Sequence, residues 1–309
     1  MRACRMKKLN FSRDIMRGIF KIITIGMLSA SALPLFAKDP TIRKAIPVDQ
    51  PDTLPPYTDT GEVPNVRAAS VMVIDAHTGK ELYEKNADEH RAPASTQKLL
   101  TALIVAESGN LDNYVTAEAS DTWAEPVVLG LKPGDTYTRR NLLTVLLVHS
   151  VNDVARCLAR DNAGSVDDFA VKMNRKAAEL GMVNSHFVNP NGLPAPGQYS
   201  TARDMAKIAL ADYANHTIRS IVATKDLWFQ FSDGHIREFK NTNRVLRACP
   251  FCNGMKTGYT EAAGRCLVCS GTSGGRDVIV VVLGDSTRTV WRDAYFLLAW
   301  GLSSDKQYD

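Results

Sequence analysis

The spacing of apolar residues divides the chain into a helical middle and strand-rich flanks. In four stretches bounded by Gly, Asn or Pro, apolar positions recur every three or four residues, as one face of an α-helix requires. The predicted helices cover Leu99–Ala106, Leu142–Ala159, Phe169–Leu180 and Met205–Ala211. We therefore expect the middle of the chain to be mostly helical.

Runs typical of β-strands lie on both sides of this region. Ala69–Asp75 and Lys80–Lys85 predict a hairpin that turns near Gly79. Later strands are expected at Gly254–Tyr259, Arg265–Ser270 and Val278–Leu283, before a last helix from about Thr289 to Leu302. The prediction is an α/β (α+β) fold, in which helices flank a largely antiparallel five-stranded sheet and a helical lobe is inserted.

The first 66 residues follow neither pattern. Seven basic residues precede the uncharged run Ile22–Ala37, which is the order of an export signal. A membrane-spanning helix is the alternative, but these 16 residues include Pro34 and fall short of the roughly 20 that cross a bilayer. We expect cleavage after Ala37, and membrane contact only if the signal is retained. Residues 38–66 are rich in Pro, Asp and Thr and predict an extended linker.

Removing the predicted signal changes the charge of the chain. The full sequence has 37 Lys and Arg against 33 Asp and Glu, whereas residues 38–309 have 30 against 32, a net charge of −2. No basic excess then remains to neutralise phosphates, so we expect no nucleic-acid partner.

Ser95-Thr-Gln-Lys98 is the first candidate for catalysis. It lies at the start of a predicted helix, where a spacing of three places the Ser hydroxyl and the Lys amine on one face. A serine needs a base to accept its proton, and a lysine serves only when its amine is neutral. Burial and a second nearby cation both favour the neutral amine.

Two further motifs follow along the chain. Ser150-Val-Asn152 is expected where a helix gives way to a turn, so that Ser150 can relay protons and Asn152 can hold a substrate amide. Lys256-Thr-Gly258 lies early in a predicted strand, where Lys256 and Thr257 can bind a carboxylate. Gly258 would let a substrate backbone lie close to the strand.

Second copies of the shorter motifs show how weak each one is alone. Ser303-Ser-Asp-Lys306 lies in the polar tail, and we interpret it as chance. Ser108-Gly-Asn110 lies at the end of the helix that begins near Ser95 and is explained as a glycine helix stop. Only the three motifs together, in this order and on a helix, a turn and a strand, indicate catalysis.

Together, the three motifs are those of β-lactamases and penicillin-binding proteins. More narrowly, the chain resembles the low-molecular-mass penicillin-binding D-alanyl-D-alanine carboxypeptidases over roughly residues 67–301. The resemblance rests on Arg91–Lys98, Phe187–Asp204 and Gly254–Gly264. It implies a β-lactamase/DD-peptidase-like fold. Together with the export signal and the linker, it predicts a division of the chain into a signal peptide (1–37), a linker (38–66), a catalytic domain (67–302) and a polar tail (303–309).

The resemblance also implies the chemistry. Ser95 would attack the carbonyl between two D-alanines of a peptidoglycan stem peptide, Lys98 would take its proton, and Ser150 would help protonate the leaving D-alanine. Lys256 and Thr257 would hold the terminal carboxylate, while the N–H groups of Ser95 and Tyr259 would form the oxyanion hole. No cofactor or metal is expected.

β-Lactams would acylate the same serine as covalent inhibitors. Their release is expected to be slow, because no Glu-x-x-x-Asn of the kind that supplies a deacylating base in class A β-lactamases follows Ser150. A DD-endopeptidase or a β-lactamase of the same fold remains the alternative, since the chain is short and stops soon after its last helix. The Ser150-Val-Asn-Asp-Val-Ala stretch favours the carboxypeptidase.

The cysteines support a hypothesis of another class. Cys249-Pro-Phe-Cys252 and Cys266-Leu-Val-Cys269 have zinc-ribbon spacing. Against a zinc site, Cys266 and Cys269 lie three apart in a predicted strand and would point to opposite faces. A disulfide among Cys249, Cys252 and Cys269 is the competing interpretation, and antiparallel pairing of the two strands would bring Cys252 near Cys269. Cys157, His149 and His186 are expected to be structural.

Overall fold

The computed structural model describes residues 53–124 and 126–303. Its main sheet has five strands in the order β2-β1-β9-β8-β7, and every neighbouring pair is antiparallel. The strands are β1 (Ser70–Asp75), β2 (Glu81–Lys85), β7 (Cys252–Thr260), β8 (Gly264–Ser273) and β9 (Arg276–Asp285). The predicted sheet, assembled from early and late strands, is confirmed.

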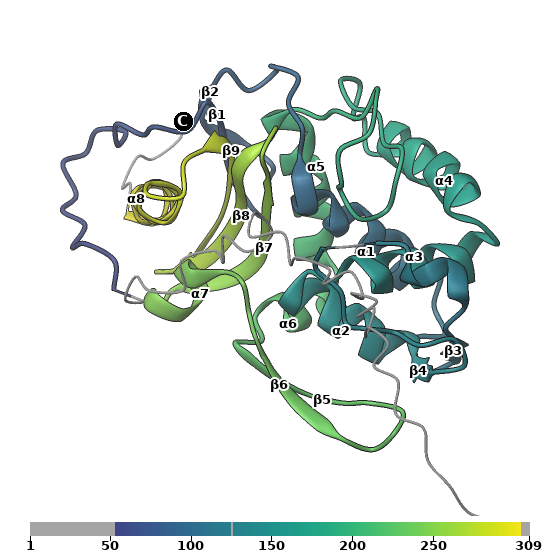
Figure 1. Cartoon of the computed structure of the whole chain (residues 1–309). Coiled ribbons are helices and arrows are strands. Elements are labelled where there is room, and N and C mark those ends of the chain that lie inside the picture. The colour runs from purple at the N-terminus through teal and green to yellow at the C-terminus, as the bar shows by residue number, and fades with distance from the viewer. Residues whose placement is uncertain (1–52, 125, 304–309) are drawn as a thin grey trace, which may run out of the picture. The chain divides into compact units, whose positions relative to one another are not determined.

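The central strand β9 explains how the sheet is covered on both faces. Its residues Val278–Leu283 are all buried, and alternate side chains enter two separate apolar clusters. Val280 and Val282 pack beneath α8 (Val290–Ser303), whereas Ile279 and Val281 face the helical lobe. Figure 1 shows α8 on one side of the sheet and the lobe on the other.

The helical lobe lies between β2 and β7 in the sequence. Its helices are α1 (Lys98–Glu107), α2 (Arg139–His149), α3 (Asn152–Ala163), α4 (Val166–Glu179), α5 (Ala202–Ala214) and α6 (His216–Val222). Short 3-10 helices η1 (Ala94–Gln97) and η2 (Ala119–Thr122) accompany them, and α7 (Arg244–Ala248) precedes β7. All four stretches predicted as helical are helical, and Leu142–Ala159 is divided between α2 and α3 by a break at Ser150 and Val151.

Two small sheets were not expected from the sequence. They are formed by β3 (Tyr114–Thr116) with β4 (Thr136–Thr138), and by β5 (Asp226–Gln230) with β6 (Ile236–Lys240). The β5–β6 hairpin extends away from the main sheet in Figure 1. Each of its strands buries one phenylalanine, Phe229 or Phe239. One buried position per strand is too little alternation to be recognised as a strand pattern.

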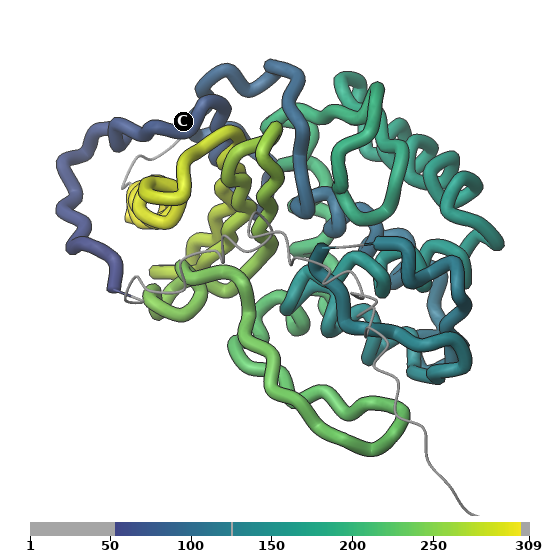
Figure 2. The backbone as a smooth tube through the Cα atoms, viewed as in Figure 1, coloured from purple at the N-terminus to yellow at the C-terminus, as the bar shows by residue number. Residues whose placement is uncertain are grey.

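The described part of the predicted linker packs against α8. Residues 53–66 have no helix or strand, yet Leu54 and Tyr57 contact the cluster beneath α8, and the ring centroids of Tyr57 and Phe296 are 5.6 Å apart. Figure 2 shows this segment as the purple tube that runs around α8. The predicted signal peptide, residues 38–52 and the tail from 304 onward lie outside the described residues.

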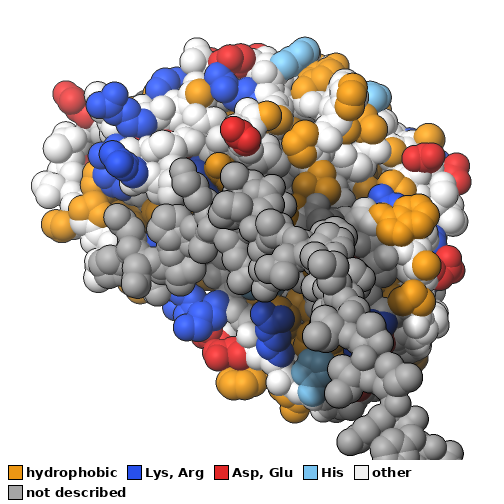
Figure 3. All heavy atoms as spheres, in the orientation of Figure 1, with side chains coloured by type: hydrophobic (Ala, Val, Ile, Leu, Met, Phe, Trp, Pro, Cys, Tyr) orange, Lys and Arg blue, Asp and Glu red, His pale blue; other side chains and the backbone are white. Residues whose placement is uncertain are grey.

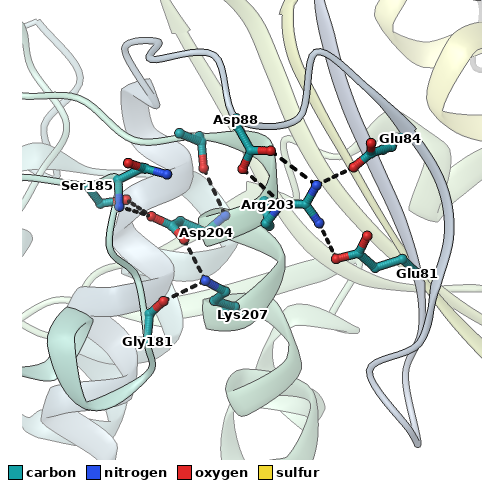
Figure 4. A network of polar contacts seen from close by, with 10 residues as sticks. Glu81, Glu84, Asp88, Gly181, Ser185, Arg203, Asp204 and Lys207 are labelled. Carbon is teal, nitrogen blue, oxygen red and sulfur yellow. Dashed lines mark hydrogen bonds and ion pairs between the residues drawn. The ribbon is translucent and has the colours of Figure 1, made fainter.

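Arg203 of α5 connects the lobe to the edge of the sheet. Its guanidinium pairs with Glu81 and Glu84 of β2, and with Asp88 at 2.8 Å in the segment that leads to η1 (Figure 4). On the visible part of the face in Figure 3, basic and acidic side chains are interspersed and hydrophobic ones are scattered. Within the described residues, no helix is long and apolar enough to cross a membrane.

Candidate active site

The candidate nucleophile and its base meet at the junction of η1 and α1. Ser95 lies in the 3-10 turn η1, which leads directly into α1, and Lys98 begins α1, so the motif stands at the start of a helix as predicted. The Nζ of Lys98 is 2.8 Å from the Oγ of Ser95, so the predicted contact is present. The hydroxyl of Ser95 also lies 3.3 Å from the carbonyl oxygen of Asn191.

Lys98 is fully buried, and polar groups surround its amine. Besides Ser95, the amine donates to the Oδ1 of Asn152 at 2.7 Å and to the carbonyl oxygen of Asn191 at 2.6 Å. Burial lowers the pKa of Lys98 well below 10.5, and the positive charge of Lys256 lowers it further, whereas Asp153 raises it. The two effects expected from the sequence, burial and a second cation, both act here.

The Ser150-Val-Asn152 motif lies between two helices. Ser150 ends α2 in the left-handed region, with φ 69° and ψ 30°, and Asn152 begins α3. The backbone N–H of Asn152 donates to the carbonyl oxygen of Val127 at 2.6 Å. Ser150 is half-buried and Asn152 is buried, so the turn predicted from the sequence is present and directs the Asn152 side chain at Lys98.

Lys256, Thr257 and Gly258 lie on β7, the edge strand of the sheet. Lys256 is buried, and burial lowers the pKa of its amine to about 7. Its Nζ donates to the carbonyl oxygen of Thr257 at 2.9 Å, and the hydroxyl of Thr257 lies 2.7 Å from that of Thr242.

Gly258 packs directly on the backbone of η1. A Cβ at this position would lie 2.9 Å from the nitrogen of Ser95 and 3.0 Å from that of Thr96. The absent side chain is therefore what allows β7 and Ser95 to approach each other. The next residue, Tyr259, is 48% exposed, and the guanidinium of Arg265 lies 4.3 Å from its ring centroid.

Two residues at the site were missed from the sequence. Asn191 supplies its backbone carbonyl to Lys98, and the chemistry of its side chain gives no indication of that role. The loop that contains Asn191 contacts α1, because the hydroxyl of Thr101 donates to the carbonyl oxygen of Pro190 at 2.7 Å. A Cβ on Gly192 would lie 2.1 Å from the carbonyl oxygen of Ala94. The run of turn-forming residues in Asn189–Gly192 was the one feature of the sequence that could have indicated a tight loop here.

Asp153 is the second missed residue. Its carboxylate is buried and accepts backbone N–H groups of three successive residues, Leu129 at 2.9 Å, Gly130 at 2.9 Å and Leu131 at 3.1 Å. It therefore holds the 127–131 segment against the start of α3. Its position directly after Asn152, in a first helical turn, could have identified it.

The cysteines do not converge as a zinc ribbon would require. Cys266 belongs to the cluster that faces the lobe, whereas Cys249, Cys252 and Cys269 belong to the cluster beneath α8. The predicted opposite orientation of Cys266 and Cys269 is therefore confirmed. In the described part of the chain, no group of three or more His, Cys, Asp or Glu side chains could hold a metal ion.

The other predicted structural residues have structural contacts. Cys157 is buried in α3, and burial raises the pKa of its thiol. His149 packs on Phe239 with ring centroids 4.7 Å apart. The Nδ1 of His186 lies 2.9 Å from the carbonyl oxygen of Gly197.

Comparison with known proteins identifies the family to which the chain is similar. The family model described as D-alanyl-D-alanine carboxypeptidase, Peptidase_S11, matches residues 58–287. The D-alanyl-D-alanine carboxypeptidase DacB2 of Mycobacterium tuberculosis is 35% identical, over 79% of this chain and 86% of that protein. DacF of Bacillus subtilis, also named a D-alanyl-D-alanine carboxypeptidase, is 35% identical over 71% of this chain, but the match spans only 58% of DacF.

A solved structure agrees with the sequence matches. The crystal structure of D-alanyl-D-alanine carboxypeptidase from Mycobacterium tuberculosis H37Rv superposes with a TM-score of 0.76 at 35% identity, over 80% of this chain and 95% of that one. With the family model covering most of the chain and a relative of this similarity, the chain belongs to the D-alanyl-D-alanine carboxypeptidase family of serine peptidases.

Proposed function

We propose that this protein is a serine-type D-Ala-D-Ala carboxypeptidase that removes the last residue of peptidoglycan stem peptides through an acyl-enzyme. The observation that carries the proposal is the 2.8 Å contact between Ser95 Oγ and the amine of a fully buried Lys98. A buried amine whose pKa is lowered can accept the proton that a serine must lose to attack a carbonyl.

The contacts of Lys98 suit a neutral amine. Such an amine has two N–H bonds, which can point at Asn152 Oδ1 and at the carbonyl of Asn191, leaving its lone pair for the Ser95 hydroxyl. During acylation the Ser95 proton passes to Lys98, and Oγ bonds to the carbonyl carbon of the penultimate D-alanine. The C–N bond then breaks, and the proton leaves Lys98 through the hydroxyl of Ser150 to the amine of the released D-alanine.

Deacylation requires only water. Water adds to the acyl carbon, the bond to Oγ breaks, and a proton returns to Ser95, so the enzyme is regenerated with one stem peptide shortened by one residue. β-Lactams present a reactive amide with a carboxylate and would acylate Ser95 in the same way.

We assign substrate binding to β7 and Asn152. Protonated Lys256 and the hydroxyl of Thr257 would bind the terminal carboxylate, and Asn152 would hold a substrate amide. The close packing of Gly258 on Ser95 supports an oxyanion hole formed by the N–H groups of Ser95 and Tyr259, because it brings these two backbone segments together.

We also propose that the catalytic domain, residues 67–302, acts outside the cytoplasm, in the periplasm or its equivalent, after residues 1–37 direct export. The seven basic residues before the uncharged run Ile22–Ala37 support this location, as does a substrate that is part of the cell wall.

Changing Ser95→Ala tests the function directly. We expect capture of a fluorescent penicillin to be abolished, and release of D-alanine from a stem pentapeptide to fall by roughly a thousandfold or more. Ser108→Ala is a matched control, since Ser108 begins the second Ser-x-Asn copy and donates instead to the carbonyl of Ile104 at 2.8 Å. Penicillin labelling that survives in Ser95→Ala would refute the proposal.

The substrate separates the alternatives. A carboxypeptidase releases D-alanine from the pentapeptide, whereas an endopeptidase cleaves cross-linked stem dimers and leaves the pentapeptide intact. A β-lactamase would turn over penicillin rapidly rather than hold it as a stable adduct.

A further inference from the structure

Three cysteines gather on the face of the sheet opposite the candidate active site. Cys249 follows α7, Cys252 begins β7 and Cys269 lies in β8. They are 2%, 6% and 0% exposed and belong to the apolar cluster beneath α8. In the structure all five described cysteines carry free thiols.

The contacts within the group distinguish one pair. Cys252 of β7 pairs with Gly271 of β8, and Cys269 lies two residues before Gly271, so both cysteines lie on the α8 face of the sheet. Cys252 Sγ lies 3.2 Å from the carbonyl oxygen of Gly254, and Asn243 Nδ2 reaches both that oxygen at 2.8 Å and Cys269 Sγ at 4.0 Å. Asn243 therefore contacts Cys269 directly and is connected to Cys252 through the carbonyl oxygen of Gly254.

Cys249 lies in the turn before β7. Its carbonyl oxygen accepts the backbone N–H of Cys252 at 3.3 Å. The C-x-x-C spacing alone would favour a Cys249–Cys252 bond, but the contact of Cys252 Sγ is with the carbonyl oxygen of Gly254, which Asn243 connects to Cys269. Cys266 faces the lobe and cannot reach the group without reversing β8.

We propose that Cys252 and Cys269 form a disulfide that joins β7 to β8, and that Cys249 remains a thiol. The bond would close the β7–β8 hairpin on which Lys256 to Tyr259 lie, four residues after Cys252. It would hold the start of the substrate-binding strand from the face away from the substrate.

The reaction balances with a disulfide oxidant, such as oxidised glutathione or a thiol oxidase. The thiolate of Cys252 attacks the oxidant and releases one thiol, and then the thiolate of Cys269 attacks Cys252 Sγ and releases the second. Two electrons and two protons leave the protein. The Cys269 thiol lowers the pKa of Cys252, which favours Cys252 as the attacking sulfur, while burial raises the pKa of Cys269.

Burial of all three thiols requires the bond to form before folding is complete. The proposed export supplies an oxidising compartment for this step. A test by refolding in vitro makes the result independent of where the protein is made.

The experiment maps the bond in the refolded full chain. Reduced, unfolded protein is refolded with reduced and oxidised glutathione, blocked with N-ethylmaleimide under denaturing conditions and digested with trypsin. Cleavage after Arg247, Lys256, Arg265 and Arg276 separates Ala248–Lys256 from Cys266–Arg276. We expect these two peptides to be linked, with maleimide on Cys249 and Cys266.

Other products overturn the proposal. An unlinked Ala248–Lys256 peptide that has lost two hydrogens would indicate a Cys249–Cys252 bond, and full maleimide labelling would indicate no bond. Fragmentation that places the link on Cys249 or Cys266 would also refute it.

Two variants provide matched controls. Cys266→Ser and Cys249→Ser should retain the link, while Cys269→Ser should lose it. The oxidised wild type should melt roughly 5 °C above the protein reduced with dithiothreitol. If the oxidised protein melted at a lower temperature than the reduced one, the folded structure would not accommodate a Cys252–Cys269 bond. Penicillin labelling of the same samples reports on Ser95 separately, so failure of the link and failure of the proposed function are distinguishable.

Discussion

Lys98 and Lys256 are two buried amines with different surroundings. Lys98 has three oxygen partners, whereas Lys256 donates to the carbonyl of Thr257. Because each positive charge disfavours the other, the pair favours one proton rather than two. The proposed mechanism needs this division, with Lys98 neutral as the base and Lys256 charged to bind a carboxylate.

We expect the pH profile of kcat/KM to reflect these two amines. Burial lowers the pKa of Lys256 to about 7, so the amine of the free enzyme loses its proton, and its attraction for the substrate carboxylate, as the pH rises through that value. On the acid side, protonation of Lys98 removes the base. D-alanine release measured from pH 5 to 10 should therefore decline at both ends.

Lys256→Arg tests the alkaline limb of this profile. A guanidinium keeps its charge to high pH, so the decline above pH 7 should move to higher pH even if the maximum rate falls. A decline at the same pH in this variant would assign it to another group.

The sequence identified the side chains of the site better than its backbone groups. Ser95, Lys98 and Asn152 are polar side chains in motifs, and the structure brings them together. The carbonyl of Asn191 belongs to a group that every residue has, so only the fold could show that this one faces Lys98.

Arg203 shows how elements far apart in sequence are joined around the site. It ties α5 to β2 and to the segment that leads to Ser95 through Glu81, Glu84 and Asp88 (Figure 4). Next to it, Asp204 accepts the N–H of Asn184 at 2.8 Å and pairs with Lys207 at 2.9 Å. These contacts fix the N-terminal end of α5 against both neighbours.

Arg203→Ala should lower the free energy of unfolding by about 1 to 2 kcal/mol, since three partly exposed pairs are lost at up to about 1 kcal/mol each. Chemical denaturation measures the change. Arg175→Ala is the matched control, because Arg175 has one exposed pair with Glu179 at 3.8 Å, and it should change stability by less than about 0.5 kcal/mol. Equal effects of the two substitutions would contradict a role for the network.

The elements that could be predicted were those with a strong apolar period. β9 and the helices α1, α4 and α5 were identified by their patterns of buried apolar positions, whereas α2 and α3 were predicted as one helical stretch. The β5–β6 hairpin has few buried residues and η1 depends on local turn geometry. The sequence therefore did not predict the hairpin, and it did not distinguish the 3-10 turn at Ser95 from the α-helix that follows.

The stability of the whole fold is lowered by Asp212, a carboxyl group buried within the core. It lies in α5, is 0% exposed, and neither carboxyl oxygen has a hydrogen-bond partner among the described residues. Burial raises its pKa well above 3.8, and Glu107 raises it further. The folded protein therefore binds this proton more tightly than the unfolded chain does.

The sign of the pH dependence follows from this difference. The tighter proton binding by Asp212 in the folded state adds to the free energy of unfolding. This contribution is fully present below about pH 3.8 and is lost as the pH rises through the higher folded-state pKa. Asp212→Asn should raise the free energy of unfolding by about 1 to 3 kcal/mol at pH 8 and should change this free energy little at pH 4. Denaturant unfolding at the two pH values measures this, and an equal effect at both would refute the assignment.

The backbone conformation of Ser150 lowers the stability of the fold, whereas its hydroxyl has a proposed role in proton transfer. A non-glycine residue with φ 69° is strained by about 1 kcal/mol or more, while glycine adopts this conformation freely. Selection for thermal stability would therefore favour glycine here, whereas the proton transfer proposed for Ser150 would retain the hydroxyl. Under that mechanism, position 150 is a place where an engineered, more stable version of this enzyme would become a well-folded but inactive protein.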